Sequence, residues 1–126
     1  MYKIGEIIEI KTNEGAYTLC VDKVEKTSDR NQFDESNPAE VYKITYTYSN
    51  ISLADNLYIS EYDFGLIDST GTMGFSYPGS TRKYPNETVK GAKCTAEMTL
   101  ASHTSGDKLL LTYRDNFFSD SVDVYI

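Results

Sequence analysis

The stretch VYKITYTYSN, residues 41–50, alternates large side chains with small polar ones. Every second position carries a large residue: Tyr42, Ile44, Tyr46 and Tyr48. A period of two places the large residues of a β-strand on one face and the polar residues on the other. We therefore predict a strand over residues 40–50. Its tyrosines either fill a core, with their hydroxyls at the rim, or form a wet binding platform, and the usual burial of large side chains favours the core.

Further short alternating segments occupy most of the chain. The predicted strands cover residues 4–11, 17–25, 62–68, 93–101, 108–114 and 122–126, and residues 51–60 form either an edge strand or a connecting turn. Val24 breaks the alternation of its strand, as a β-bulge would. The strand over 62–68 points Tyr62, Phe64 and Leu66 inward, and a turn with the sequence Asp-Ser-Thr-Gly at residues 68–71 closes it. Residues 26–39 form a loop whose one large apolar residue is Phe33. Turns rich in Gly, Asn, Asp and Ser separate the strands, and no segment has helical periodicity. Seven to eight such strands indicate an all-β fold, an antiparallel sandwich or barrel.

The length and charge of the chain exclude several classes of function. Its 126 residues suit a single domain spanning residues 1–126. The net charge of −7 disfavours binding to nucleic acid and to anionic membrane surfaces. The charge is uneven, because residues 78–94 carry +3 and the remainder carries −10. No apolar run approaches the ~20 residues of a membrane-spanning helix, so we expect no direct insertion into a membrane.

The two cysteines, Cys20 and Cys94, both lie on predicted strands. They lack the close spacing of a zinc or thioredoxin-type site. They form a disulfide if their strands face each other, and otherwise they are two buried free thiols. Alternation points Cys94 toward the core and Cys20 away from it, which counts against the disulfide unless a bulge intervenes.

Strand-and-turn motifs follow one another along the chain in a characteristic order: GEIIEI, GAYTLCVDKV, VYKITYTYSN, YDFGLIDSTG, NETVKGAKCTAEMTL and DKLLLTY. In this order the chain resembles the immunoglobulin-like domains of unknown function in secreted proteins and lipoproteins of Gram-positive bacteria, and the telokin-like domain family is the nearest name. The resemblance implies an immunoglobulin-like β-sandwich at the cell envelope, without catalytic residues to carry over. A signal peptide and a lipidated cysteine usually precede such domains, so an extracellular or cell-surface location assumes that a targeting segment was removed.

The segment 72–90 is long for a connection in a compact domain, and long loops are often functional. It combines aromatic with basic side chains, which suit a glycan through stacking or an acidic partner through charge. The candidate ligand-binding residues are Phe75, Tyr77, Arg82, Lys83 and Tyr84. The alternative is that Phe75 and Tyr84 cap the edge of the sandwich while Arg82 and Lys83 are merely solvated.

Other polar groups give weaker signals. The only histidine, His103, falls in a predicted turn and reads as a solvated loop residue. The acidic segments 29–35 and 115–123 do not have the EF-hand spacing of a calcium loop. Asn50 and Asn86 begin glycosylation sequons, a pattern that often arises by chance. We expect no cofactor and no metal.

Taken together, these features favour a non-catalytic binding or accessory domain outside the cell, with an unidentified protein or a cell-wall glycan as its partner. One alternative is a small hydrolase or lyase that uses two carboxylates in a cleft, since spatial pairing among 19 acidic residues is invisible in sequence. The other alternative is a purely structural spacer.

Overall fold

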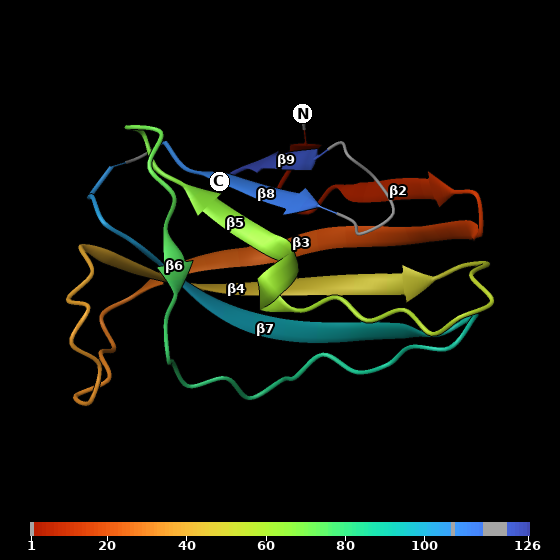
Figure 1. Ribbon diagram of the computed structural model, residues 1–126, viewed down its shortest axis with the longest axis horizontal. Helices are drawn as coiled ribbons and strands as arrows, with labels where there is room; N and C mark the ends of the chain where they lie inside the picture. The colour runs from red at the N-terminus through yellow and green to blue at the C-terminus, as the bar shows by residue number, and fades with distance from the viewer. Residues whose placement is uncertain (1, 107, 115–120) are drawn as a thin grey trace.

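The computed structural model describes residues 2–106, 108–114 and 121–126, which form two packed β-sheets (Figure 1). The four-stranded sheet has the order β1 (Tyr2–Lys3), β9 (Ser121–Tyr125), β8 (Leu110–Arg114), β5 (Phe64–Ile67). The five-stranded sheet has the order β2 (Ile7–Thr12), β3 (Gly15–Thr27), β4 (Glu40–Asn50), β7 (Lys93–Ser102), β6 (Phe75–Ser76). All pairs are antiparallel except β1 with β9. The predicted all-β, antiparallel immunoglobulin-like sandwich is confirmed.

The tyrosines of β4 lie in the core, as the alternation predicts. Tyr46 and Tyr48 have no measurable exposure, and their rings stack with centroids 6.1 Å apart. The Tyr46 hydroxyl donates to the carbonyl of Ile59 at 2.8 Å, and the Tyr48 hydroxyl donates to the carbonyl of Asn86 at 2.7 Å. Each buried phenol therefore satisfies its polar end on the backbone of a connecting segment that covers the sheet.

Among the crossings of the chain between the two sheets, those from β1 to β2 and from β5 to β6 depend on glycine. The predicted strand over residues 4–11 is divided, because Gly5 adopts φ +87° between β1 in one sheet and β2 in the other. At the opposite edge, Gly74 donates its N–H to the carbonyl of Leu66 in β5, and the chain then enters β6. A Cβ at residue 74 would lie 2.2 Å from the carbonyl oxygen of Ala101, so the crossing requires glycine.

The structure settles three local assignments made from the sequence, two in connecting segments and one within β3. Residues 51–60 contain no strand and only an isolated bridge between Leu57 and Thr88. A 3-10 turn, η1 (Glu61–Asp63), replaces the predicted start of the strand at residue 62, so Tyr62 is 84% exposed instead of pointing inward. The bulge expected near Val24 is confirmed by a shift of register between Val21 and Lys23.

Cys20 and Cys94 are both free, so the candidate disulfide does not form. They lie on β3 and β7, which are separated by β4. Cys20 is in register with Thr47 and Cys94 with Tyr48, so the two thiols project from opposite faces of one sheet. Burial, reinforced by the neighbouring Asp22, raises the pKa of Cys20 to about 11, which keeps this thiol protonated at neutral pH.

Asn50 ends β4 with a fully buried amide that bonds to three backbone groups in two segments. Its Nδ2 donates to the carbonyls of Asp55 and Thr88, both at 3.1 Å, and its Oδ1 accepts from the N–H of Leu53 at 2.9 Å. A buried amide with all of these partners fixes the loop after β4 against the segment that precedes β7.

Replacing Asn50 with alanine tests this role. Asn50→Ala removes three hydrogen bonds and leaves the buried N–H of Leu53 unpaired, so we expect the free energy of unfolding to fall by about 2–4 kcal/mol. Urea denaturation measures the loss. Ser49→Ala, one residue away with its side chain on the outer face of the same strand, is the control and should change stability by less than about 0.5 kcal/mol.

Candidate functional site

The five candidate residues of segment 72–90 divide into two groups. Phe75 and Tyr77 face inward, where they pack with Val41 and Ala101 in a small core cluster beside β6. The Tyr77 hydroxyl accepts the backbone N–H of Asn31 at 2.8 Å. These two aromatic side chains therefore close the edge of the sandwich, as the capping alternative predicts for Phe75.

The remaining three candidates, Arg82, Lys83 and Tyr84, are exposed, and Tyr84 keeps 66% of its surface. The structure thus does not bring the five residues together on one face. Figure 1 shows the segment that carries these three running along β7, and Glu97 donates its backbone N–H to the carbonyl of Lys83 at 2.9 Å. Whether the three bind a ligand stays a prediction.

The carboxylate of Glu97 anchors this exposed segment. Its Oε1 accepts the backbone N–H groups of Arg82 and Lys83 at 3.0 and 3.2 Å, and its Oε2 lies 3.4 Å from Nζ of Lys43. Burial by itself raises the pKa of Glu97, but the hydrogen bonds from these donors outweigh it and lower the pKa below its usual value. The charged carboxylate is therefore the form that holds the segment in place.

We expect Glu97→Ala to release the 81–84 segment, because it deletes both backbone hydrogen bonds and the ion pair. Arg82 and Lys83 are trypsin cleavage sites, so limited proteolysis at these two bonds should become faster while the sandwich stays folded. The matched control is Glu25→Ala, which removes an exposed carboxylate paired with Lys23. Equal cleavage rates in both variants would show that Glu97 does not anchor the segment.

A pocket of about 430 Å³ lies between the loop after β3 and the segment after β6. We call it the loop pocket, and its lining is Thr27, Asp29, Arg30, Asn31, Gln32, Phe33, Val41, Lys43, Tyr77, Pro78, Gly79, Ser80 and Thr99. Buried Val41 and Tyr77 contribute an apolar part of the lining, while hydroxyl, amide and basic groups supply its polar part. Phe33 also lines the pocket and is 85% exposed.

The turn that carries Phe33 is fixed by hydrogen bonds. Oδ1 of Asn31 accepts the N–H of Phe33 at 2.9 Å, and the carbonyl of Asn31 accepts the N–H of Asp34 at 3.1 Å. Nδ2 of Asn31 also donates to the carbonyl of Pro78 at 3.3 Å, across the pocket to the other segment. An exposed aromatic ring is thus presented on an ordered turn.

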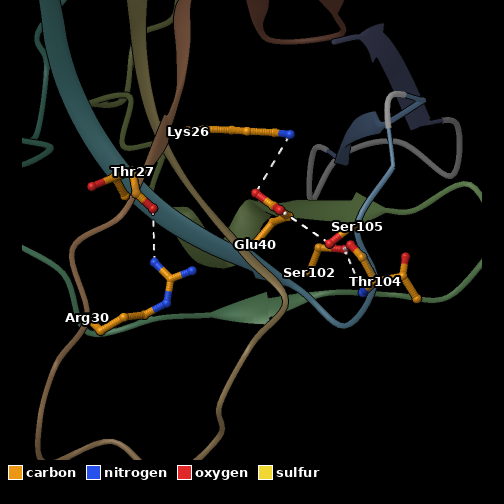
Figure 2. A network of polar contacts seen from close by, with 7 residues as sticks. All are labelled: Lys26, Thr27, Arg30, Glu40, Ser102, Thr104 and Ser105. Carbon is orange, nitrogen blue, oxygen red and sulfur yellow. Dashed lines mark hydrogen bonds and ion pairs between the residues drawn. The ribbon is translucent and has the colours of Figure 1, made fainter.

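Figure 2 shows the polar contacts at the base of this loop. Arg30 Nη1 donates to the carbonyl of Thr27 at 2.9 Å, so the guanidinium folds back over the start of the loop. Nζ of Lys26 lies 3.7 Å from Oε2 of Glu40, and the hydroxyl of Ser105 donates to Oε1 of Glu40 at 3.3 Å. These contacts tie the end of β3 to the start of β4 and to the turn after β7, which fixes both ends of the loop that carries Phe33.

The other polar groups singled out from the sequence lie as follows. His103 is exposed in the turn after β7, as predicted, with its ring centroid 4.8 Å from that of Phe75. Of the two sequons, Asn86 is exposed whereas Asn50 is enclosed. Within residues 2–106, 108–114 and 121–126, no three His, Cys, Asp or Glu side chains gather as metal ligands, and residues 115–120 of the second acidic segment fall outside the described residues. No helix in the described part of the chain is long and apolar enough to cross a membrane.

The carboxyl of Asp68, in the turn after β5, has a strongly lowered pKa. Its Oδ1 accepts the hydroxyl and N–H of Thr70 and the N–H of Thr72, and its Oδ2 accepts the hydroxyl of Thr104 at 2.9 Å. These bonds, led by that from the Thr70 hydroxyl, lower the pKa of Asp68 to about 2. The ionised carboxylate therefore joins the turn after β5, predicted from its Asp-Ser-Thr-Gly sequence, to the turn after β7.

The lowered pKa of Asp68 predicts a pH dependence of stability. Because the folded pKa lies below the ordinary value of 3.8, the stabilisation is complete above about pH 4 and disappears as the pH falls toward 2. Asp68→Asn should unfold at a lower temperature than the parent chain at pH 7, and the two melting temperatures should converge near pH 2. Melting curves at pH 7, 4 and 2.5 test this. A gap that stays constant from pH 7 to 2.5 would contradict it.

Comparisons with known proteins bear on the fold. No protein-family model matches the chain, and no curated protein matches it in sequence. Two solved structures are similar over nearly its whole length. One is the secreted protein MPT63 of Mycobacterium tuberculosis, with 10% identity, a TM-score of 0.67 and coverage of 98% of this chain and 92% of that one. The other is the yjhA protein of Bacillus subtilis, with 19% identity, a TM-score of 0.68 and coverage of 100% and 99%. At these identities the likeness shows a shared β-sandwich fold alone.

Sequence reasoning did not find the loop pocket. It assigned residues 26–39 to a loop and noted Phe33 as its one large apolar residue, but gave that residue no role. The sequence did contain a signal, because a single aromatic residue among polar, turn-forming residues is often exposed on a loop and available for binding. The segment 72–90 was predicted to bind a ligand, and of its five candidate residues only Tyr77 lines this pocket. Which two segments meet at the pocket is visible only in the folded chain.

Proposed function

We propose that the chain is a non-catalytic binding domain that acts outside the cytoplasm and recognises a cell-wall glycan in the loop pocket. The observation that carries the proposal is the exposed ring of Phe33, held on an ordered turn beside a polar pocket of about 430 Å³. Nothing in the described core packs against this ring, so its exposure is not explained by folding.

The chemistry of the pocket suits a sugar. A pyranose ring has an apolar C–H face that stacks on an aromatic ring, and hydroxyls at its edge that need paired donors and acceptors. Arg30 offers donors, while Asn31 and Gln32 offer both kinds of group. The size of the pocket falls within the usual range for small-molecule sites and accommodates one or two sugar units.

The proposed location rests on resemblance. The order of motifs is similar to that of telokin-like domains of Gram-positive secreted proteins and lipoproteins, and one protein that shares the fold is described as secreted. Membership of that family, attachment to the envelope and an extracellular place form part of the proposal. Fractionation of the source cells with an antibody to the domain tests the location independently of any ligand.

Titration calorimetry with soluble cell-wall glycan fragments tests the ligand. We expect binding by the parent chain, and Phe33→Ala should weaken it by about tenfold, or 1.4 kcal/mol, because the stacking surface is lost. Arg30→Gln should weaken it as well. Both side chains are exposed, so neither variant should change the melting temperature by more than about 1 °C.

Tyr84→Ala is the matched control, because it also deletes an exposed aromatic ring but lies outside the loop pocket. If Tyr84→Ala abolished binding while Phe33→Ala left it unchanged, the site would lie in the segment 72–90, as predicted from the sequence. Failure of every fragment to bind would count against a glycan and favour a protein partner or a spacer. Release of shorter fragments during the titration would favour the carboxylate-dependent hydrolase or lyase.

A further inference from the structure

Strand β2 (Ile7–Thr12) is the outermost strand of the five-stranded sheet (Figure 1). Within the described residues, β3 is the only strand that pairs with it. An open strand edge presents unpaired N–H and C=O groups to which another strand can bind, and proteins commonly blunt such edges with proline, a bulge or a very short strand. β2 has six residues, no proline and an unbroken register with β3. Its edge is therefore suitable for pairing with a further strand.

The backbone groups at the open edge belong to alternate residues of β2. Ala16 of β3 is in register with Lys11, but its N–H donates to the hydroxyl of Ser52 and its carbonyl accepts the N–H of Ser52, on the side away from β2. Lys11 and Ala16 thus exchange no hydrogen bonds. Because hydrogen-bonded and non-hydrogen-bonded pairs alternate along an antiparallel ladder, Ile7, Glu9 and Lys11 all turn their N–H and C=O groups toward the open edge.

The outer face of β2 carries charges in an order that complements itself in the reverse direction. Glu9 and Lys11 are both exposed, and Nζ of Lys11 lies 3.5 Å from Oε1 of Glu9. When two copies of β2 pair antiparallel about a twofold axis at Ile10, Glu9 of each copy faces Lys11 of the other. An axis at Glu9 would oppose two carboxylates, and an axis at Lys11 would oppose two ammonium groups. The charge order therefore favours a single register.

The same register completes contacts that β2 lacks in one copy. Each facing pair of Glu9 and Lys11 exchanges both of its N–H···O bonds through the groups at the open edge. Ile7 is 69% exposed, and it comes diagonally next to Lys11 of the second copy, whose methylene stem covers it. On the inner face, the side chain of Ile10 meets its own copy at the axis. Hydrogen bonds, charge and apolar contact thus agree on one arrangement.

We propose that β2 is the interface of a homodimer, in which two copies pair antiparallel about Ile10 and join their five-stranded sheets into one continuous sheet. A second copy suits this edge better than an unrelated extended segment, because the order of Glu9 and Lys11 complements itself. One strand edge is smaller than a standard protein interface, so we expect a dissociation constant of about 0.1 mM. No residue of β2 lines the loop pocket, so the dimer is independent of the proposed function.

Sedimentation equilibrium of the unmodified chain from about 10 µM to 1 mM tests the proposal. Lys11→Glu places two carboxylates in each facing pair, and Glu9→Lys places two ammonium groups there. Each variant alone should associate about tenfold more weakly than the parent chain. An equimolar mixture of the two variants restores opposite charges in both facing pairs, so it should form a heterodimer about as stable as the parent dimer.

Lys23→Glu is the matched control, because it makes the same change of net charge in another exposed lysine–glutamate pair, outside β2. It should leave the association unchanged. A parent chain that stays monomeric at 1 mM would overturn the proposal, and binding of an extended peptide by that monomer would give the edge a different partner. Association of Lys11→Glu as strong as that of the parent chain would place the interface elsewhere. A mixture that associates no better than its two components would exclude the register about Ile10.

Discussion

The fold depends on the hydrogen bonds that the buried tyrosines of β4 make with connecting segments. A sheet face covered by another sheet can be filled with aliphatic residues, but the four-stranded sheet does not cover all of β4 (Figure 1). The ring of Tyr46 packs against Phe64 of β5, and the hydroxyls of Tyr46 and Tyr48 donate to the carbonyls of Ile59 and Asn86 in connecting segments. Because an unpaired buried phenol costs free energy, each connection must lie where its carbonyl meets a hydroxyl. The connecting segments around Ile59 and Asn86 therefore cover the core even though they form no strand there.

This arrangement explains why the exposed features occur on ordered segments. The loop after β4 is fixed by Tyr46 and by the amide of Asn50, so η1 projects Tyr62 from a rigid base. On the opposite face, Glu97 and Lys43 hold the segment that passes along β7. Loops are usually the least ordered parts of a sandwich, but here both sides of β4 and β7 supply polar anchors. Binding at these loops would cost correspondingly little ordering entropy.

Sequence predicted the features that follow from local periodicity, and it missed those that depend on contacts between distant segments. The strand over 40–50, the bulge near Val24 and the turn at Asp68 each follow from a few adjacent residues. The crossing between sheets at Gly74 does not, because only the approach of Ala101 makes a side chain impossible there. Tyr62 matched the alternation of its neighbours, yet the capping box of Ser60 and Asp63 turned it outward. For the cysteines, local alternation already placed the two thiols on opposite faces. The order of the strands, which the sequence does not show, then separates them by β4.

The charge pattern acquires meaning only when the chain is folded. In sequence, the basic residues near 82 and 83 lie next to Tyr84, which suggests one aromatic and basic site. In the structure, Tyr84 lines a hollow together with Glu61 and Glu97, and Arg82 and Lys83 lie outside that lining. The loop pocket instead recruits its cations from Arg30 and Lys43. An acidic protein thus presents two hollows of different charge, because the fold determines which charged side chains meet at each.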